Sequence, residues 1–131
     1  MSVLLDTHVW LGWLVAGDLL STRERKSLDA LAERRELSIA AISIWEAQML
    51  HAKRRLRLPL PLGAWLPEAA SLVNVVPLDV DVVLALDALP APFHGDPADR
   101  MIVATARAHV QLLATHDRAI RRSRLARLWR P

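Results

Sequence analysis

The sequence predicts a single α/β domain built on a parallel sheet. Short apolar runs alternate along the chain with longer segments of helical periodicity, which is the pattern of β-α-β units. The chain has 131 residues, enough for one domain with its own core. Because 53% of the residues are hydrophobic and 24% are charged, we expect a globular protein. No internal repeat or linker divides residues 1–131.

The first strand and the first two helices are expected near the N-terminus. Residues 2–6 are apolar or small up to the last position, as in a buried strand. Apolar side chains then recur at helical spacing from Thr7, and this helix should end near Gly17. Ser21 is a favourable N-cap for a second helix over about 22–35.

The middle of the chain is expected to hold a strand, a longer helix and a connection. A strand over about 37–41 is followed by a helix from Ile44 to about Arg55. Three prolines and one glycine within 56–67 then indicate a connection that holds at most a short helix, around 62–71.

The C-terminal half continues the alternation. Its predicted elements, in chain order, are a strand at 74–77, a helix at 79–88, a helix at 98–109, a strand at 111–115, a short helix at 118–123 and a strand at 125–129. Asp79 opens the first of these helices, where its charge is favourable to the helix dipole. A loop rich in proline and glycine separates the two longer helices.

The composition excludes several classes of function. The chain has no cysteine, so it has no disulfide, no thiolate zinc site and no cysteine nucleophile. The N-terminus lacks the basic and apolar pattern of a signal peptide, and no apolar segment reaches the roughly 18 residues of a membrane span. We therefore expect a cytoplasmic protein.

Positive charge is concentrated in the C-terminal segment. Residues 118–131 include six arginines and no acid, whereas the rest of the chain has 11 basic and 14 acidic residues. Such a segment could contact the phosphates of a nucleic acid. It could equally be a solvated helix face with cations near a helix C-terminus, and the sequence leaves both interpretations open.

Four carboxylates fall where an α/β protein places a ligand site. Asp6 and Asp117 follow apolar runs, Glu46 opens a helix after another run, and Asp99 lies in the first turn of a helix. Ligands of an open parallel sheet bind outside the carboxyl ends of its strands. Four acids that converge there would repel one another unless a cation held them. Carboxylate ligands favour Mg²⁺ or Mn²⁺.

Three of these acids also have a purely structural interpretation. Asp6 and Asp117 could each cap the helix that follows. Ser43 and Glu46 have the spacing of a capping box, with Ser43 as the N-cap residue. Asp6 nevertheless ends a strand that should be buried, and a buried carboxylate is costly unless it is paired or binds a metal ion.

Asp99 is harder to explain by capping. Asp96 is a favourable N-cap, because a proline follows it at the first helical position. Asp99 instead shares a helix face with Ile102, Val103 and Ala106, and we expect this face to be buried. Asp96 itself could cap the helix or support the site from outside.

Further polar residues lie close to the acids in sequence. Thr115 ends a strand, where its hydroxyl could bond a ligand or a carboxylate, or simply suit a strand. Arg100 could contact phosphate or pair with an acid. His8, His94 and His116 lack the spacing of metal ligands, so we expect them to orient other groups or contact a substrate.

Several stretches together resemble the PIN-domain family, and within it the VapC toxins of type II toxin–antitoxin pairs. The matching stretches are 4–10 (LLDTHVW), 43–46 (SIWE), 94–100 (HGDPADR), 102–106 (IVATA) and 115–117 (THD). Each stretch alone is a weak signal. Their order and spacing over nearly the full length make the resemblance specific.

The resemblance implies a fold, a site and an activity. It implies a sheet of order 3-2-1-4-5 with helices on both faces and an acidic pocket at the strand ends. The family's acidic positions correspond to Asp6, Glu46, Asp99 and Asp117. The resemblance further implies RNA cleavage that depends on Mg²⁺ or Mn²⁺, a homodimer, and inhibition by a small DNA-binding antitoxin of the VapB kind.

The chemistry of the residues agrees with phosphodiester hydrolysis, because carboxylate-held ions can activate water and neutralise developing charge. In this hypothesis Asp6 and Asp99 ligate the metal most directly, while Glu46 and Asp117 complete the shell or position the water. Arg100 and the arginines of the C-terminal segment are candidates for phosphate contacts. The alternative is a catalytically silent binding module that sequesters RNA or a protein partner.

Overall fold

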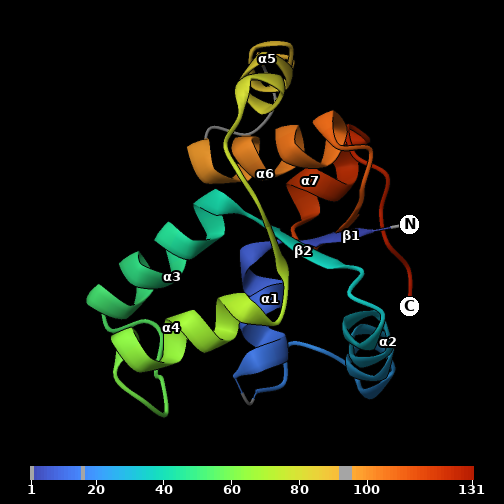
Figure 1. Cartoon of the computed structure of the whole chain (residues 1–131). Helices are drawn as coiled ribbons and strands as arrows, with labels where there is room; N and C mark the ends of the chain where they lie inside the picture. The colour runs from blue at the N-terminus through green and yellow to red at the C-terminus, as the bar shows by residue number, and fades with distance from the viewer. Residues whose placement is uncertain (1, 16, 92–95) are drawn as a thin grey trace.

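The computed structural model describes residues 2–15, 17–91 and 96–131, and in them a parallel sheet carries helices on both faces (Figure 1). The strands are β1 (Val3–Leu5), β2 (Leu37–Ala40), β3 (Asn74–Val76) and β4 (Leu112–Ala114). The helices are α1 (Thr7–Leu14), α2 (Thr22–Glu33), α3 (Ala41–Ala52), α4 (Leu62–Ser71), α5 (Val80–Asp87), α6 (Pro97–Ala108) and α7 (Arg118–Ser123). The predicted α/β class is confirmed.

The strands pair in the order β3-β2-β1-β4, and every pair is parallel. This agrees with the expected order except at one edge. The fifth strand predicted at 125–129 is wrong as a strand, because only a single bridge between Leu113 and Leu128 forms there. Leu113 donates to the carbonyl of Arg127 at 2.8 Å and accepts from the Trp129 amide at 2.9 Å. The segment therefore lies beside β4, as expected, but pairs with one residue only.

Side chains of the sheet alternate between two cores. Val3 and Leu5 of β1 belong to one core, which contains apolar residues of α1, α2 and α4. Leu4, between them, belongs to the other core, with apolar residues of α5, α6 and α7. Figure 1 shows the same division, with α6 and α7 on one side of the strands and α1, α2 and α4 on the other. This period-two alternation is that of a strand buried on both faces.

Most helix starts agree with the sequence. Ser21 caps α2 in a full capping box with Glu24, and Asp79 caps α5 by accepting from the Val82 amide. The start of α3 differs, because this helix begins at Ala41 directly after β2, with Ala40 as an N-cap that makes no side-chain bond. The capping box predicted for Ser43 and Glu46 is therefore wrong. Both residues lie inside α3.

The carboxyl ends of the central strands lie at one edge of the sheet. β1 ends at Leu5 beside Ala114, the last residue of β4, and is also in register with Ile39 of β2. Residues that directly follow these strands are thereby brought together although they are far apart in sequence. Within the described ranges, no helix has the length and apolar character needed to cross a membrane.

Candidate active site

Asp6 lies at the end of β1 and is only 2% exposed. It is the N-cap of α1, and its Oδ1 accepts a hydrogen bond of 2.8 Å from the Thr7 amide. Its Oδ2 accepts a hydrogen bond of 2.6 Å from the Thr115 hydroxyl, just after β4. Capping thus accounts for one oxygen only, while the second is oriented by a residue that follows another strand.

Glu46 reaches the same region from α3. Its Oε1 accepts a hydrogen bond of 2.5 Å from the Thr7 hydroxyl. The Thr7 and Ser43 hydroxyl oxygens are 2.8 Å apart. Because the single hydroxyl proton of Thr7 is donated to Glu46, the Ser43 hydroxyl donates to Thr7. Ser43 supports the site through this buried contact. Thr7 therefore connects both acids, since its amide binds Asp6 and its hydroxyl binds Glu46.

The charge around Glu46 is unfavourable in the protein alone. Burial raises the pKa of Glu46 above its usual range, and the nearby negative charges of Asp6 and Asp96 raise the pKa further, although the hydrogen bond from Thr7 opposes this rise. A carboxylate with such neighbours is one that a bound cation would stabilise.

Asp99 completes the acidic set. It lies in the first turn of α6, and Ile102, Val103 and Ala106 on the same face are buried, as predicted. Asp6, Glu46 and Asp99 all line one cavity of about 270 Å³, together with His8, Arg55 and apolar side chains of α1 and α3. We call this space the acidic cavity. Three of the four acids that the sequence singled out thus line one cavity.

Asp96 and Asp117 are placed differently. Asp96 is the N-cap of α6, and its Oδ1 accepts from the Ala98 amide at 2.9 Å. Asp117 is the N-cap of α7, and its Oδ1 accepts from the Ile120 amide at 2.9 Å. Neither residue lines the acidic cavity, and nor does Arg100. The amide of Asp117 donates to the Thr115 hydroxyl at 3.0 Å, so Asp117 is connected to Asp6 through Thr115.

The donor chemistry of the acidic cavity fits a hard divalent cation, because carboxylate oxygens are the side chains that Mg²⁺ and Mn²⁺ prefer. The carboxylates are not drawn together in the protein alone. Among the residues that the structure describes, no three histidine, aspartate or glutamate side chains are close enough to hold one ion. Asp6 and Glu46 are instead held by threonine hydroxyls. Ligation by three acids would require their side chains to move closer.

The comparison with known families decides the class of protein. The profile described as "PIN domain" matches residues 3–124, nearly the whole chain. The chain belongs to the PIN-domain family. A curated relative, "Ribonuclease VapC22" of Mycobacterium tuberculosis, is 38% identical over 123 residues, which cover 94% of this chain and 92% of the relative. The resemblance inferred from the sequence motifs is thereby confirmed.

Solved structures share the fold at low sequence identity. This PIN domain resembles a chain of VapBC2 from Rickettsia felis, bound to a promoter DNA fragment, with a TM-score of 0.73 and 14% identity over 98% of both chains. A chain of DNA-bound VapBC from Salmonella typhimurium gives a TM-score of 0.76 and 16% identity over 98% of this chain and 97% of that one. At these identities the likeness concerns the fold alone.

Two histidines of the PIN domain form a chain of contacts that ends at Asp6. The His116 amide donates to His8 Nε2 at 3.2 Å, so His8 carries its proton on Nδ1, which lies 3.5 Å from Asp6 Oδ2. His116 Nε2 lies 2.6 Å from Glu24 Oε2. An orienting role for His8 and His116 agrees with this geometry. The predicted role of His94 concerns a residue outside the described ranges.

Glu24 and Thr7 are site neighbours that the sequence reasoning missed. Burial alone would raise the pKa of Glu24, but hydrogen bonds from the Ser21 backbone, from His116 and from the Ser21 side chain, with the charge of His116, together lower that pKa below its usual value. Glu24 forms a capping box with Ser21, and this local role gives no indication of its contact with the distant His116. Thr7 was visible as the residue after Asp6, but nothing local showed that it reaches α3.

Proposed function

We propose that this PIN domain is an endoribonuclease that depends on Mg²⁺ or Mn²⁺ and acts as the toxin of a toxin–antitoxin pair. One observation carries the proposal: Asp6, Glu46 and Asp99, from three separate elements, line a single cavity at the carboxyl ends of the strands. The relative that matches almost the full length is named a ribonuclease.

Asp6, Asp99 and Glu46 would hold the ion, and Asp117 would tune the site through Thr115 rather than through the acidic cavity. When bound, a divalent ion activates water and neutralises charge on the scissile phosphate. Asp6 is pre-oriented by Thr7 and Thr115, which reduces the cost of placing its oxygens.

Glu46 is suited to handle a proton. Its Oε1 is bonded to Thr7, so Oε2 is the oxygen that can accept a proton from an attacking water. Burial and the charges of Asp6 and Asp96 raise the pKa of Glu46 in the metal-free protein, and the charge of a bound cation would oppose this rise and keep the carboxylate ionised. Asp96 contributes through its negative charge and by fixing the start of α6, which carries Asp99. Arg100 is a candidate phosphate contact next to Asp99.

The substrate would be RNA, and the protein partners a VapB-like antitoxin and a second copy of the chain. The solved relatives are titled as VapBC complexes, which supports an antitoxin partner. Exposed apolar side chains around the start of α5, namely Leu78, Val80, Val83 and Leu84, offer a surface for a protein contact.

An RNA-cleavage assay with and without EDTA tests the proposal. Asp6→Asn and Asp99→Asn should each lower the cleavage rate by at least about 100-fold, because each removes a charged metal ligand. Asp81→Asn is the matched control, since Asp81 lies in the first turn of α5, as Asp99 does in α6, but is exposed and outside the acidic cavity. Full activity of both site variants would reject the proposal.

The alternative, a silent module that only binds RNA or a protein, is favoured by one observation. No three acidic or histidine side chains of the described residues are already at metal-holding distances. Calorimetric titration with Mn²⁺ separates the two functions. A nuclease should bind Mn²⁺ and lose that binding in Asp6→Asn, whereas a silent module would show neither.

A further inference from the structure

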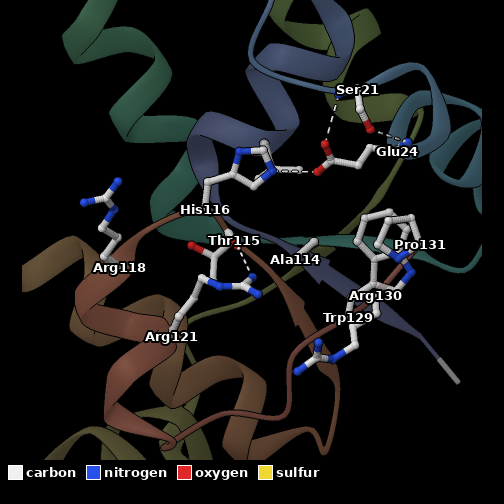
Figure 2. A pocket seen from close by; sticks show the side chains of 11 residues that line it. Ser21, Glu24, Ala114, Thr115, His116, Arg118, Arg121, Trp129, Arg130 and Pro131 are labelled. Atoms are coloured by element: carbon white, nitrogen blue, oxygen red, sulfur yellow. Dashed lines mark hydrogen bonds and ion pairs between the residues drawn. The ribbon is translucent and has the colours of Figure 1, made fainter.

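A second cavity, of about 540 Å³, adjoins the catalytic region and differs from it in charge (Figure 2). We call it the basic pocket. Its lining includes three arginines, one carboxylate, one histidine and one indole, namely Arg118, Arg121, Arg130, Glu24, His116 and Trp129. The arginines come from α7 and from the C-terminal segment whose charge the sequence analysis noted without assigning it a role.

The side chains that line the pocket carry more positive charge than the carboxylate of Glu24 can balance. Both oxygens of Glu24 are engaged, since Oε1 accepts from the Ser21 amide at 2.9 Å and Oε2 lies 2.6 Å from His116 Nε2. Within the described ranges, neither Arg118 nor Arg130 forms an ion pair with a carboxylate. These two exposed guanidinium groups are therefore available to an anion.

The other arginine is part of the wall. Arg121 donates a hydrogen bond of 3.0 Å to the Thr115 carbonyl, which holds its side chain against the pocket, as Figure 2 shows. Trp129 adds a half-buried indole that packs against the core. A fixed aromatic surface next to cationic groups is the combination that binds an unpaired nucleobase and its phosphate.

Hydrogen bonds link residues of the basic pocket to residues of the acidic cavity. Thr115 lines the basic pocket and donates to Asp6, which lines the acidic cavity. The His116 side chain lines the basic pocket, while its amide donates to His8 on the acidic cavity. Thr115 and His116 therefore connect the basic pocket with the residues of the acidic cavity.

We propose that the basic pocket binds single-stranded RNA next to the cleaved bond, with Arg118 and Arg130 on separate phosphates at its two ends and Trp129 stacked on one base. This rests on the proposed function, because it assigns the substrate a path through the same site. The base must be unpaired to reach the indole, so the pocket selects single strands over duplex. The unused positive charge and the adjoining Asp6 favour RNA over an acidic protein segment as the occupant.

Binding of a short fluorescent single-stranded RNA, measured by anisotropy in EDTA so that no cleavage occurs, tests the proposal. The pocket double variant Arg118→Ala/Arg130→Ala is compared with Arg122→Ala/Arg127→Ala. The control has the same net charge and changes the same two segments, but its residues do not line the basic pocket. The pocket variant should bind about ten-fold more weakly, and the control less than about three-fold.

Salt dependence and the indole add independent readouts. Loss of two phosphate contacts on a single strand should lower the slope of log Kd against log salt by roughly 1.4. Trp129→Leu should weaken binding by about ten-fold with the slope unchanged, while Trp129→Phe keeps a stacking surface and most of the affinity. Thermal melting verifies that each variant folds. If Trp129→Leu does not fold, the RNA affinity of Trp129→Phe still tests the stacking role of the indole.

Two results would contradict the proposed role of the basic pocket in RNA binding. Equal losses in the two arginine double variants would show a diffuse charge effect. Wild-type RNA affinity in the pocket variant would show that these arginines serve another occupant, such as an acidic segment of a protein. Failure of the proposed nuclease function would be seen separately, as an absence of RNA cleavage in Mn²⁺ by the wild type and by every variant. In that case, a loss of RNA binding in EDTA that is confined to the pocket variant would still support the basic pocket as an RNA site.

Discussion

The hydroxyl of Thr115 donates a hydrogen bond of 2.6 Å to Oδ2 of Asp6, across 109 positions of sequence. The two residues follow β4 and β1, which are neighbours in the sheet. This bond fixes the oxygen of Asp6 that its role as a helix cap leaves unused. It therefore orients the acid from outside the acidic cavity, in the way that hydrogen-bond donors behind a metal ligand fix its orientation.

Removing that hydroxyl should weaken the site without unfolding it. Thr115→Val keeps the shape of the side chain but loses the donor to Asp6, so Mn²⁺ affinity should fall by about 10-fold or more. Thr115→Ser retains the donor and should stay within a few-fold of the wild type. Calorimetric titration of the two variants measures the difference. Equal Mn²⁺ affinity in the valine and serine variants would contradict an orienting role.

Thr7 should behave in a similar way for Glu46. Thr7→Val removes the donor to Glu46 Oε1 and leaves the buried Ser43 hydroxyl without its acceptor. We expect a loss of roughly 10- to 100-fold in RNA-cleavage rate, the range found for outer partners of metal ligands. Thr7→Ser is the control, because it keeps both hydrogen bonds. A valine variant as active as the serine variant would show that Thr7 does not matter to Glu46.

Two glutamates should respond to amide substitution with opposite sign. The folded pKa of Glu46 is raised, so ionised Glu46 destabilises the metal-free protein, and this cost grows as pH rises above about 4.5 through the folded pKa. Glu46→Gln should therefore raise the melting temperature of the metal-free protein at neutral pH. The effect should vanish in acid, where the wild-type group is protonated.

Glu24 has a lowered folded pKa, so its ionised form stabilises the fold above about pH 4.5, and this contribution is lost as pH falls through the folded pKa. Glu24→Gln should lower the melting temperature at neutral pH, by a few degrees at most because the pair with His116 is partly exposed. Scanning calorimetry at neutral and acid pH measures both variants. Shifts of the same sign would contradict the account of the two environments.

Asp117 is expected to act mainly as a helix cap. Asp117→Asn preserves an N-cap acceptor for the Ile120 amide, so stability should be kept and RNA cleavage should fall by no more than a few-fold. Asp117→Ala removes the acceptor and should cost about 1 kcal/mol of stability. Chemical denaturation and cleavage rates report the two effects separately. A large loss of cleavage in the asparagine variant, with stability intact, would instead indicate a metal ligand.

Much of the site could be predicted because the carboxyl ends of parallel strands lie at one edge of the sheet. Asp6 directly follows an apolar run, and parallel pairing places the residues that follow such runs at one edge of the sheet. Glu46 lies inside α3, the helix that begins at this same edge where β2 ends. Asp99 could be placed by the burial of its helix face. These inferences need only local periodicity and one rule of topology.

The rest depended on contacts between distant residues. Nothing near Glu24 in the sequence indicates a bond with His116, and nothing near Ser43 indicates a contact with Thr7. The start of α3 was placed too late because Ser43 is a good cap by type, whereas β2 passes into the helix without a loop. The fifth strand was overestimated because the segment is rich in apolar residues but pairs only at Leu113.

The most direct test of the central claim is anomalous scattering from crystals of the protein grown with Mn²⁺. A manganese peak is expected in the acidic cavity, with carboxylate oxygens of Asp6 and Asp99 as ligands and Glu46 beside it. Catalytically active protein whose only manganese lies elsewhere, with Asp6 still bonded to Thr115 and the acidic cavity empty, would contradict that claim.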